Sequence, residues 1–141
     1  MSLESLLSDK TVYKVAPDKS AVAGLISAAH KDLETAAYLL KADRFDWAFS
    51  VAYNAMLRSG RAYMLSLGYR PSTTNGHVAV MKFLKETLHG KAYEGLVISM
   101  DRIRKKRHQF VYEEPDIVPE GEAKSAIAAS EKFVKTIESL V

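Results

Sequence analysis

The amino-acid sequence predicts an all-α protein: an up-and-down bundle of four main helices with additional short helices. Apolar residues recur every three or four positions over long stretches, which is the spacing of one helix face. Glycine and proline interrupt these stretches at a few points, and no stretch of useful length alternates apolar and polar residues as strands do. We expect the 141 residues to form a single domain, with residues 1–19 as an N-terminal covering segment.

The first half of the chain predicts a short amphipathic turn followed by two long helices. Ser2 is suited to cap the turn, because its hydroxyl can accept a hydrogen bond from a free backbone N–H. The first long helix is expected to open at Asp18 or Ser20 and to keep its apolar spacing as far as Leu40. The second is expected over about Phe45 to Leu67, with many small residues on its inward line.

One glycine inside the second helix and one just after it indicate how this helix is stabilised and where it ends. Gly60 would weaken an isolated helix by about 1 kcal/mol relative to alanine, which indicates that packing holds this helix together. Gly68 follows the last apolar position and is expected to end the helix as a left-handed cap.

The second half of the chain predicts three further helices. The loop from Tyr69 to Gly76 leads into a shorter helix from His77 to Gly90. The next long helix begins near Lys91 and is broken by Glu113 to Pro115. A last helix presents an apolar line from Ala123 to Leu140.

The long helix that begins near Lys91 carries the feature that points to function. Leu96, Met100 and Ile103 form its inward line, and the next position on that line is Arg107. A cation aimed at the interior needs an anionic partner or a water-filled cavity, because burying it alone is costly. Arg107 therefore predicts a site. The alternative is that the side chain lies along apolar surface with its head in water.

Basic side chains cluster around Arg107, and His108 and Tyr112 lie on a neighbouring ridge of the same helix. Arginine can hold a phosphate through two parallel hydrogen bonds, and histidine can transfer a proton near neutral pH. Together these abilities suffice for metal-free RNA cleavage, in which a 2′-hydroxyl attacks its own phosphate. The candidate catalytic residues are Arg107, His108 and Tyr112. The candidate nucleotide- or RNA-binding residues are Arg102, Arg104, Lys105 and Arg107.

Composition excludes several other classes of site. The chain has no cysteine, which excludes disulfides, thiolate catalysis and cysteine-based zinc sites. Its four histidines do not have the spacing of metal ligands, so we expect no metal and no cofactor. No apolar run approaches the roughly 20 residues that span a bilayer, and we expect a soluble cytoplasmic protein without a membrane partner. The net charge of +3 is modest, so the local basic cluster matters more than the total.

Four segments together resemble one known family. They are the helix–link–helix stretch from Ala28 to Ala48, the A-Y-N-A-M-L-R-S-G-R-A-Y segment from Ala52 to Tyr63, the G-x-x-P…H loop from Gly68 to His77, and R-H-Q-F-V-Y from Arg107 to Tyr112. The chain is similar to the HEPN domains (higher eukaryotes and prokaryotes nucleotide-binding), in particular to their small stand-alone prokaryotic branch. The last segment matches that branch's R-N-x-x-x-Y motif.

The resemblance implies a helical bundle that forms a homodimer, with the two arginine motifs meeting across a cleft lined by Arg107 and Tyr112. It also implies pairing with a minimal nucleotidyltransferase in a toxin–antitoxin module. Active toxins of the family are ribonucleases with an R-x(4–6)-H motif. Counted from Arg107, the histidine position of that motif holds Tyr112, and an R-x(5)-H match exists only between Arg102 and His108.

Three hypotheses follow from these residues and from the resemblance. The first is a HEPN component of a toxin–antitoxin module that binds nucleotide or RNA phosphate, or a nucleotidyltransferase, through the Arg107 cleft. The second is an active metal-independent endoribonuclease that uses Arg107 with His108 or Tyr112. The third is a purely structural helical dimer whose basic run faces solvent.

Overall fold

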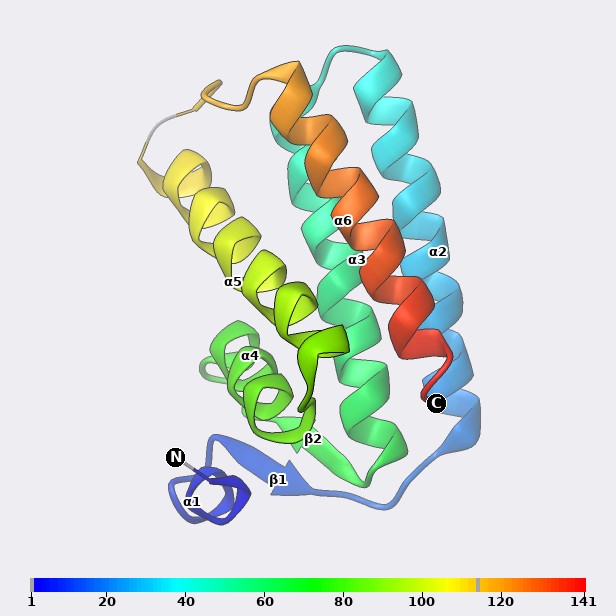
Figure 1. Cartoon of the computed structure of the whole chain (residues 1–141), viewed down its shortest axis with the longest axis vertical. Coiled ribbons are helices and arrows are strands. Elements are labelled where there is room, and N and C mark those ends of the chain that lie inside the picture. Colours follow the sequence, from blue (N-terminus) through cyan, green and yellow to red (C-terminus); the bar gives the residue numbers. More distant parts are fainter. Residues whose placement is uncertain (1, 114) are drawn as a thin grey trace.

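Figure 1 shows the computed structural model, which describes residues 2–113 and 115–141. Four long helices and two short ones make up most of the described chain, which confirms the predicted all-α bundle. No helix in the described ranges has the length and apolar character needed to cross a membrane. The helices are α1 (Leu3–Ser8), α2 (Lys19–Lys41), α3 (Phe45–Ser66), α4 (Gly76–Thr87), α5 (Lys91–Tyr112) and α6 (Glu120–Glu138), and the strands are β1 (Val12–Lys14) and β2 (Tyr69–Pro71).

Helix α3 is the centre of the bundle, with α2 and α6 lying along it (Figure 1). Small residues on α3 allow this close approach, and four of its alanines are fully buried. Between α6 and α3, the Ser130 hydroxyl donates to the Ala52 carbonyl oxygen at 2.7 Å. Between α2 and α3, the Asp32 carboxylate accepts from the Asn54 amide at 3.1 Å and lies 3.3 Å from Arg58 Nε. Apolar packing and buried polar contacts thus hold these three helices together.

The helix ends follow local sequence signals. Ser2 and Ser5 form a reciprocal capping box at the start of α1. Asp18 caps α2 by accepting a hydrogen bond from the Ala21 backbone N–H at 3.1 Å. Gly68 has a φ of +90° just after α3, a conformation that costs residues with a Cβ more than it costs glycine.

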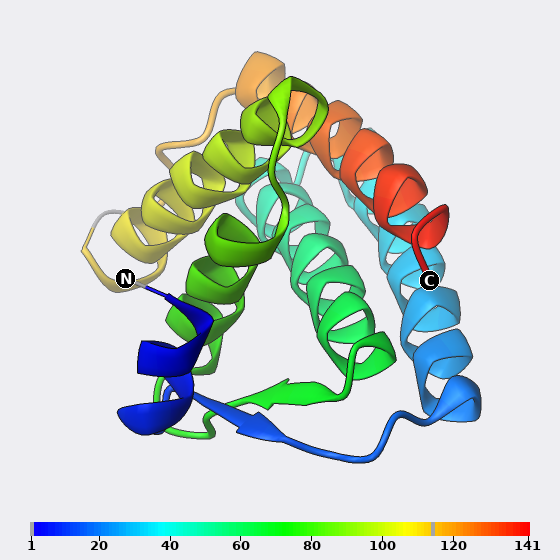
Figure 2. The ribbon, with the colours of Figure 1, turned by 60° about the horizontal axis from the view of Figure 1, so that its bottom comes forward.

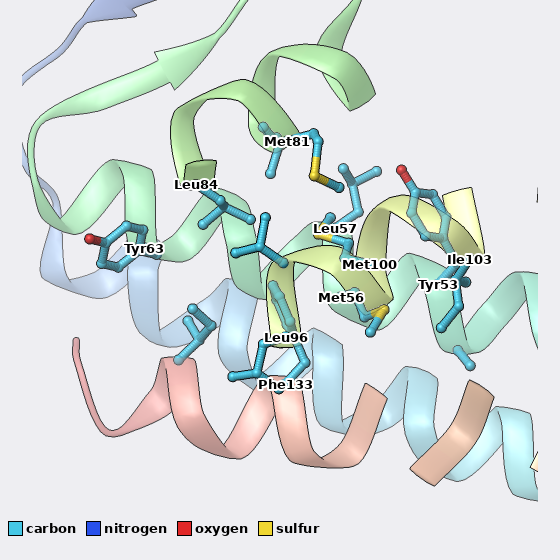
Figure 3. Packing of buried hydrophobic residues seen from close by; sticks show 14 of the residues in the cluster. Tyr53, Met56, Leu57, Tyr63, Met81, Leu84, Leu96, Met100, Ile103 and Phe133 are labelled. Atoms are coloured by element: carbon cyan, nitrogen blue, oxygen red, sulfur yellow. The ribbon is translucent and has the colours of Figure 1, made fainter. Parts of the chain in front are cut away.

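Helix α5 leans away from α2, α3 and α6, and α4 fills the space beneath it (Figure 1). Leu96, Met100 and Ile103 of α5 pack with apolar residues of α3 and α4 in the core that Figure 3 shows. Beyond them Phe110 is buried, and its ring meets that of Phe49 edge-on at 5.5 Å. Val111, the next residue of α5, is exposed. Adjacent helical positions point about 100° apart, so Phe110 and Val111 cannot both face α3.

The sequence predicts no strands, but the structure contains two short ones, β1 and β2. They pair antiparallel, with Val12 opposite Pro71 and Lys14 opposite Tyr69. Three residues are too few to display the alternation that identifies a strand in a sequence. The pairing fastens the segment after α1 to the chain between α3 and α4 along one end of the bundle (Figure 2).

The connection from α5 to α6 is fastened to the start of α3. The Asp46 carboxylate accepts hydrogen bonds from the backbone N–H groups of Asp116, at 2.6 Å, and Val118, at 3.3 Å. Val118 is buried beside this contact. This tether and the packing of Phe110 on Phe49 hold the last turns of α5 near α3, which positions Arg107.

Candidate functional site

A cleft of about 830 Å³ opens where α3, β2, α4 and α5 meet. Four arginines from three of these elements line it: Arg61 of α3, Arg70 of β2, and Arg104 and Arg107 of α5. The polar loop of residues 71–76, His77, His108 and Tyr112 complete the lining. No aspartate or glutamate is among the described residues that line the cleft, so its field is strongly positive.

Arg107 is half-buried between α5 and α3. Its Nε donates to the Ser50 hydroxyl at 3.0 Å, and its Cζ lies 5.7 Å from the centre of the Tyr53 ring. Both partners belong to α3 and neither carries a negative charge. Within the described ranges Arg107 makes no ion pair, so its charge is available to an anion in the cleft.

Arg61 brings a second guanidinium to the start of α4. A Cβ placed at Gly76 would lie 3.3 Å from Arg61 Nη2, so the glycine leaves room for this side chain. Arg61 Nε is buried and has no hydrogen-bond partner among the described residues. Leaving a buried donor without a hydrogen bond costs about 1–3 kcal/mol.

His77 lines the same cleft at the start of α4. Its Nδ1 lies 3.1 Å from the Tyr53 hydroxyl oxygen. Burial lowers the pKa of His77, and the positive charges of Arg107, Arg61 and Arg104 lower that pKa further. Burial raises the pKa of Tyr53 to about 12. Near neutral pH the site therefore holds a neutral imidazole and a protonated phenol.

Arg104 is partly neutralised by Asp101. Its Nη2 donates to Asp101 Oδ1 at 3.0 Å, while Lys85 Nζ and Lys105 Nζ lie 3.5 and 3.3 Å from Oδ2 of the same carboxylate. Burial opposes ionisation of Asp101, but hydrogen bonds from Arg104 and Lys105 outweigh it and lower its pKa. One carboxylate thus faces three cations, and a positive excess remains beside the cleft.

The residues predicted from the sequence separate into two groups. Arg104, Arg107, His108 and Tyr112 line the cleft, with the His108 and Tyr112 rings 4.7 Å apart at its exposed edge. Arg102 is exposed and Lys105 is held by Asp101, and neither lines the cleft. Because α5 turns its side chains through about 100° per residue, these two point away from the line that Arg107 occupies.

Sequence reasoning did not assign Arg61, Arg70 and His77 to the site. They come from α3, β2 and α4, and only the tertiary fold brings them to α5. Two signals were present: His77 ends the G-x-x-P…H loop, and Arg61 stands between the small buried residues Gly60 and Ala62. Neither signal indicates which part of α5 the residue meets.

A second large groove lies between the start of α2 and the end of α6. It encloses about 930 Å³ and is lined mainly by apolar side chains such as Val22, Ile26 and Leu140. Its polar groups include His30 and Glu138, which already pair with each other at 3.0 Å. No group of three or more histidine, aspartate or glutamate side chains in the described ranges is placed to hold a metal ion. The arginine cleft is therefore the better candidate for a polar ligand.

A comparison of the sequence with protein-family models identifies the family of the chain. The model of the HEPN domain matches residues 22–140, which is nearly the whole sequence. The chain belongs to the HEPN domain family. The HEPN match includes every residue that lines the arginine cleft, whereas α1 and β1 precede it. No curated protein sequence matches the chain.

Proposed function

We propose that this HEPN domain binds the phosphate groups of a nucleotide or of RNA in the arginine cleft. One observation carries the proposal: four arginines from three elements of the fold line a single hollow, and no carboxylate lines it in the described ranges. Guanidinium groups match phosphate oxygens with two parallel hydrogen bonds, and this attraction needs no particular base sequence.

The direct test measures the affinity of the purified protein for a short single-stranded RNA labelled at its 3′ end, by fluorescence anisotropy. Arg107→Ala should weaken binding about tenfold or more, since a hydrogen bond to a charged group contributes roughly 1.5–3 kcal/mol. Arg102→Ala is the matched control, because it removes the same charge from the same helix outside the cleft. Its effect should be several times smaller.

Two results would contradict the proposal. Equal losses in the Arg107 and Arg102 variants would show that total charge, and not the cleft, attracts the RNA. Binding of neither RNA nor nucleotide by the wild-type protein would favour the purely structural helical dimer.

The partners are proposed on the resemblance of the Arg107–Tyr112 segment to the stand-alone HEPN branch. We infer a cytoplasmic homodimer that pairs with a minimal nucleotidyltransferase in a toxin–antitoxin module. The exposure of Tyr112, whose side chain is 70% accessible at the edge of the cleft, supports a partner that approaches there. Co-expression with a minimal nucleotidyltransferase from the same genome should give a complex on affinity purification, and Tyr112→Ala should weaken that complex.

A metal-independent ribonuclease is the second candidate, and the placement of two imidazoles favours it. His77 and His108 both line the cleft that contains Arg107. The 2′-hydroxyl would attack the adjacent phosphorus and give its proton to one imidazole, and the 5′-oxygen would leave with a proton from the other. The products would carry a 2′,3′-cyclic phosphate and a 5′-hydroxyl. Mass spectrometry of RNA incubated with the protein and a chelator tests this candidate. Intact RNA would rule out metal-independent cleavage and leave the phosphate-binding proposal standing.

A further inference from the structure

The chemistry of the cleft also distinguishes between kinds of phosphate. We infer that the cleft receives a terminal phosphate group, a phosphomonoester, and that His77 takes up a proton when this dianion binds. This inference rests on the proposed phosphate-binding function and specifies its ligand.

The charge of the cleft favours a dianion. A phosphomonoester carries about −1.5 to −2 charges near neutral pH, whereas a phosphodiester inside an RNA chain carries about −1. Arg61 and Arg107 both line the cleft without an ion pair in the described part of the chain. The nearest acidic partner on α5, Asp101, is already held by Arg104, Lys85 and Lys105. The uncompensated charge therefore exceeds what one phosphodiester can neutralise.

The arrangement of donors also fits a terminal phosphate. Such a group offers three free oxygens, while an internal phosphodiester offers two that are not bonded to sugar carbons. Donors approach from three elements: Arg61 from α3, Arg107 from α5 and His77 from the start of α4.

His77 is surrounded by groups that respond to such a ligand. It shares the cleft with the cations Arg61 of α3, Arg70 of β2, and Arg104 and Arg107 of α5, and with the neutral or titratable side chains His108 and Tyr112 of α5. The Tyr53 hydroxyl of α3 lies 3.1 Å from its Nδ1. No carboxylate among the described residues lines the cleft beside it.

The consequence is a coupling between binding and protonation. In the free protein, burial and then the charges of Arg107, Arg61 and Arg104 lower the pKa of His77 and favour neutral imidazole. A bound dianion offsets the arginine charges and favours imidazolium. The imidazolium has N–H groups on both nitrogens, so Nδ1 can donate to Tyr53 while Nε2 donates to the phosphate.

The first experiment compares two RNA oligonucleotides of one sequence, labelled at the 3′ end, with either a phosphate or a hydroxyl at the 5′ end. The phosphorylated RNA should bind about tenfold more tightly, the effect expected of additional charged hydrogen bonds. Equal affinity of the two would overturn the inference and leave the proposed phosphate-binding function standing. Binding of neither would instead overturn the proposed function.

The second experiment counts protons by titration calorimetry of the 5′-phosphorylated RNA near neutral pH, in buffers that differ in ionisation enthalpy. Wild-type protein should take up protons on binding. The ligand cannot supply this signal, because the dianion is the bound form and a monoanionic phosphate must release a proton to reach it. His77→Asn, which keeps a polar group near Tyr53, should bind more weakly with the uptake lost, whereas the control His89→Asn, an exposed histidine outside the cleft, should keep it.

Proton uptake that persists in His77→Asn, or that disappears equally in His89→Asn, would overturn the role of His77. A measurement on the wild-type protein guards against variants that fail to fold. In an NMR titration the His77 ring signal should report a higher pKa in the presence of the 5′-phosphorylated RNA than in its absence. An unchanged pKa would also overturn the inference.

Discussion

Arg107 lies on the inward line of α5, where the preceding positions hold apolar side chains. The Ser50 hydroxyl, 3.0 Å from its Nε, and the Tyr53 ring stabilise the guanidinium there without neutralising it. A cation that is hydrogen-bonded but not ion-paired retains much of its capacity to attract an anion. His77, by contrast, is uncharged, because burial and the nearby arginines lower the pKa of its imidazole. Arg107 contributes to the positive charge of the cleft, and His77 makes the cleft sensitive to protonation.

At the same scale, the lowered pKa of His77 predicts how stability depends on pH. Below the ordinary histidine pKa of about 6.5 the unfolded chain binds a proton at this residue that the folded protein resists. The free energy of unfolding should therefore fall as the pH drops below this value, until the folded protein is protonated as well. Urea unfolding of wild type and His77→Asn between neutral pH and about pH 5 measures this fall in the free energy of unfolding, which should be smaller in the variant. A variant with the same pH dependence as wild type would contradict this assignment.

Among the elements, α3 and α4 are packed as closely as their side chains allow. A Cβ at Gly60 would lie 2.7 Å from Cγ1 of Val80, which is fully buried on α4. Valine in a helix has one strongly preferred χ1 rotamer, so it cannot turn away at small cost. The glycine that weakens α3 as an isolated helix is thus required by the approach of α4, which carries His77.

Gly60→Ala tests this contact. The clash should cost about 1–3 kcal/mol, and the gain in helix propensity of about 1 kcal/mol offsets only part of it. We expect a net loss of about 1 kcal/mol in the free energy of unfolding, measured by urea denaturation. Gly95→Ala on α5 is the control, because nothing lies within 4 Å of a Cβ there. That control should stabilise the protein, and equal effects of the two substitutions would show that α3 and α4 do not constrain each other.

For the whole molecule, the proposed homodimer has a candidate contact beside the cleft. Trp47 and Val111 are 66% and 45% exposed and line one hollow of about 450 Å³ between α3 and α5. Tyr112, which is also exposed, follows directly on α5. Apolar groups exposed together in this way are typical of protein–protein contacts, and a second copy joined here would place two arginine clefts near each other.

Val111→Asp tests whether this surface joins the subunits. An unpaired carboxylate in an apolar contact is costly, so the dimer dissociation constant should rise about tenfold or more in sedimentation experiments. Leu140→Asp is the control: Leu140 is also partly exposed but lies next to the C-terminus, at the other end of the bundle (Figure 1). If Leu140→Asp dissociates the dimer and Val111→Asp does not, the subunits meet at that other end.

The sequence by itself determined the helices and the inward position of Arg107 on its helix, because both depend on the spacing of apolar residues along one segment of chain. The resemblance to the HEPN family likewise came from residues within single segments. Only the tertiary structure placed Arg61, Arg70 and His77 beside Arg107, and moved Arg102 and Lys105 out of the candidate site. The reason is physical: periodicity records which face of a helix is buried, but the packing of α3, α4 and α5 decides which buried faces meet.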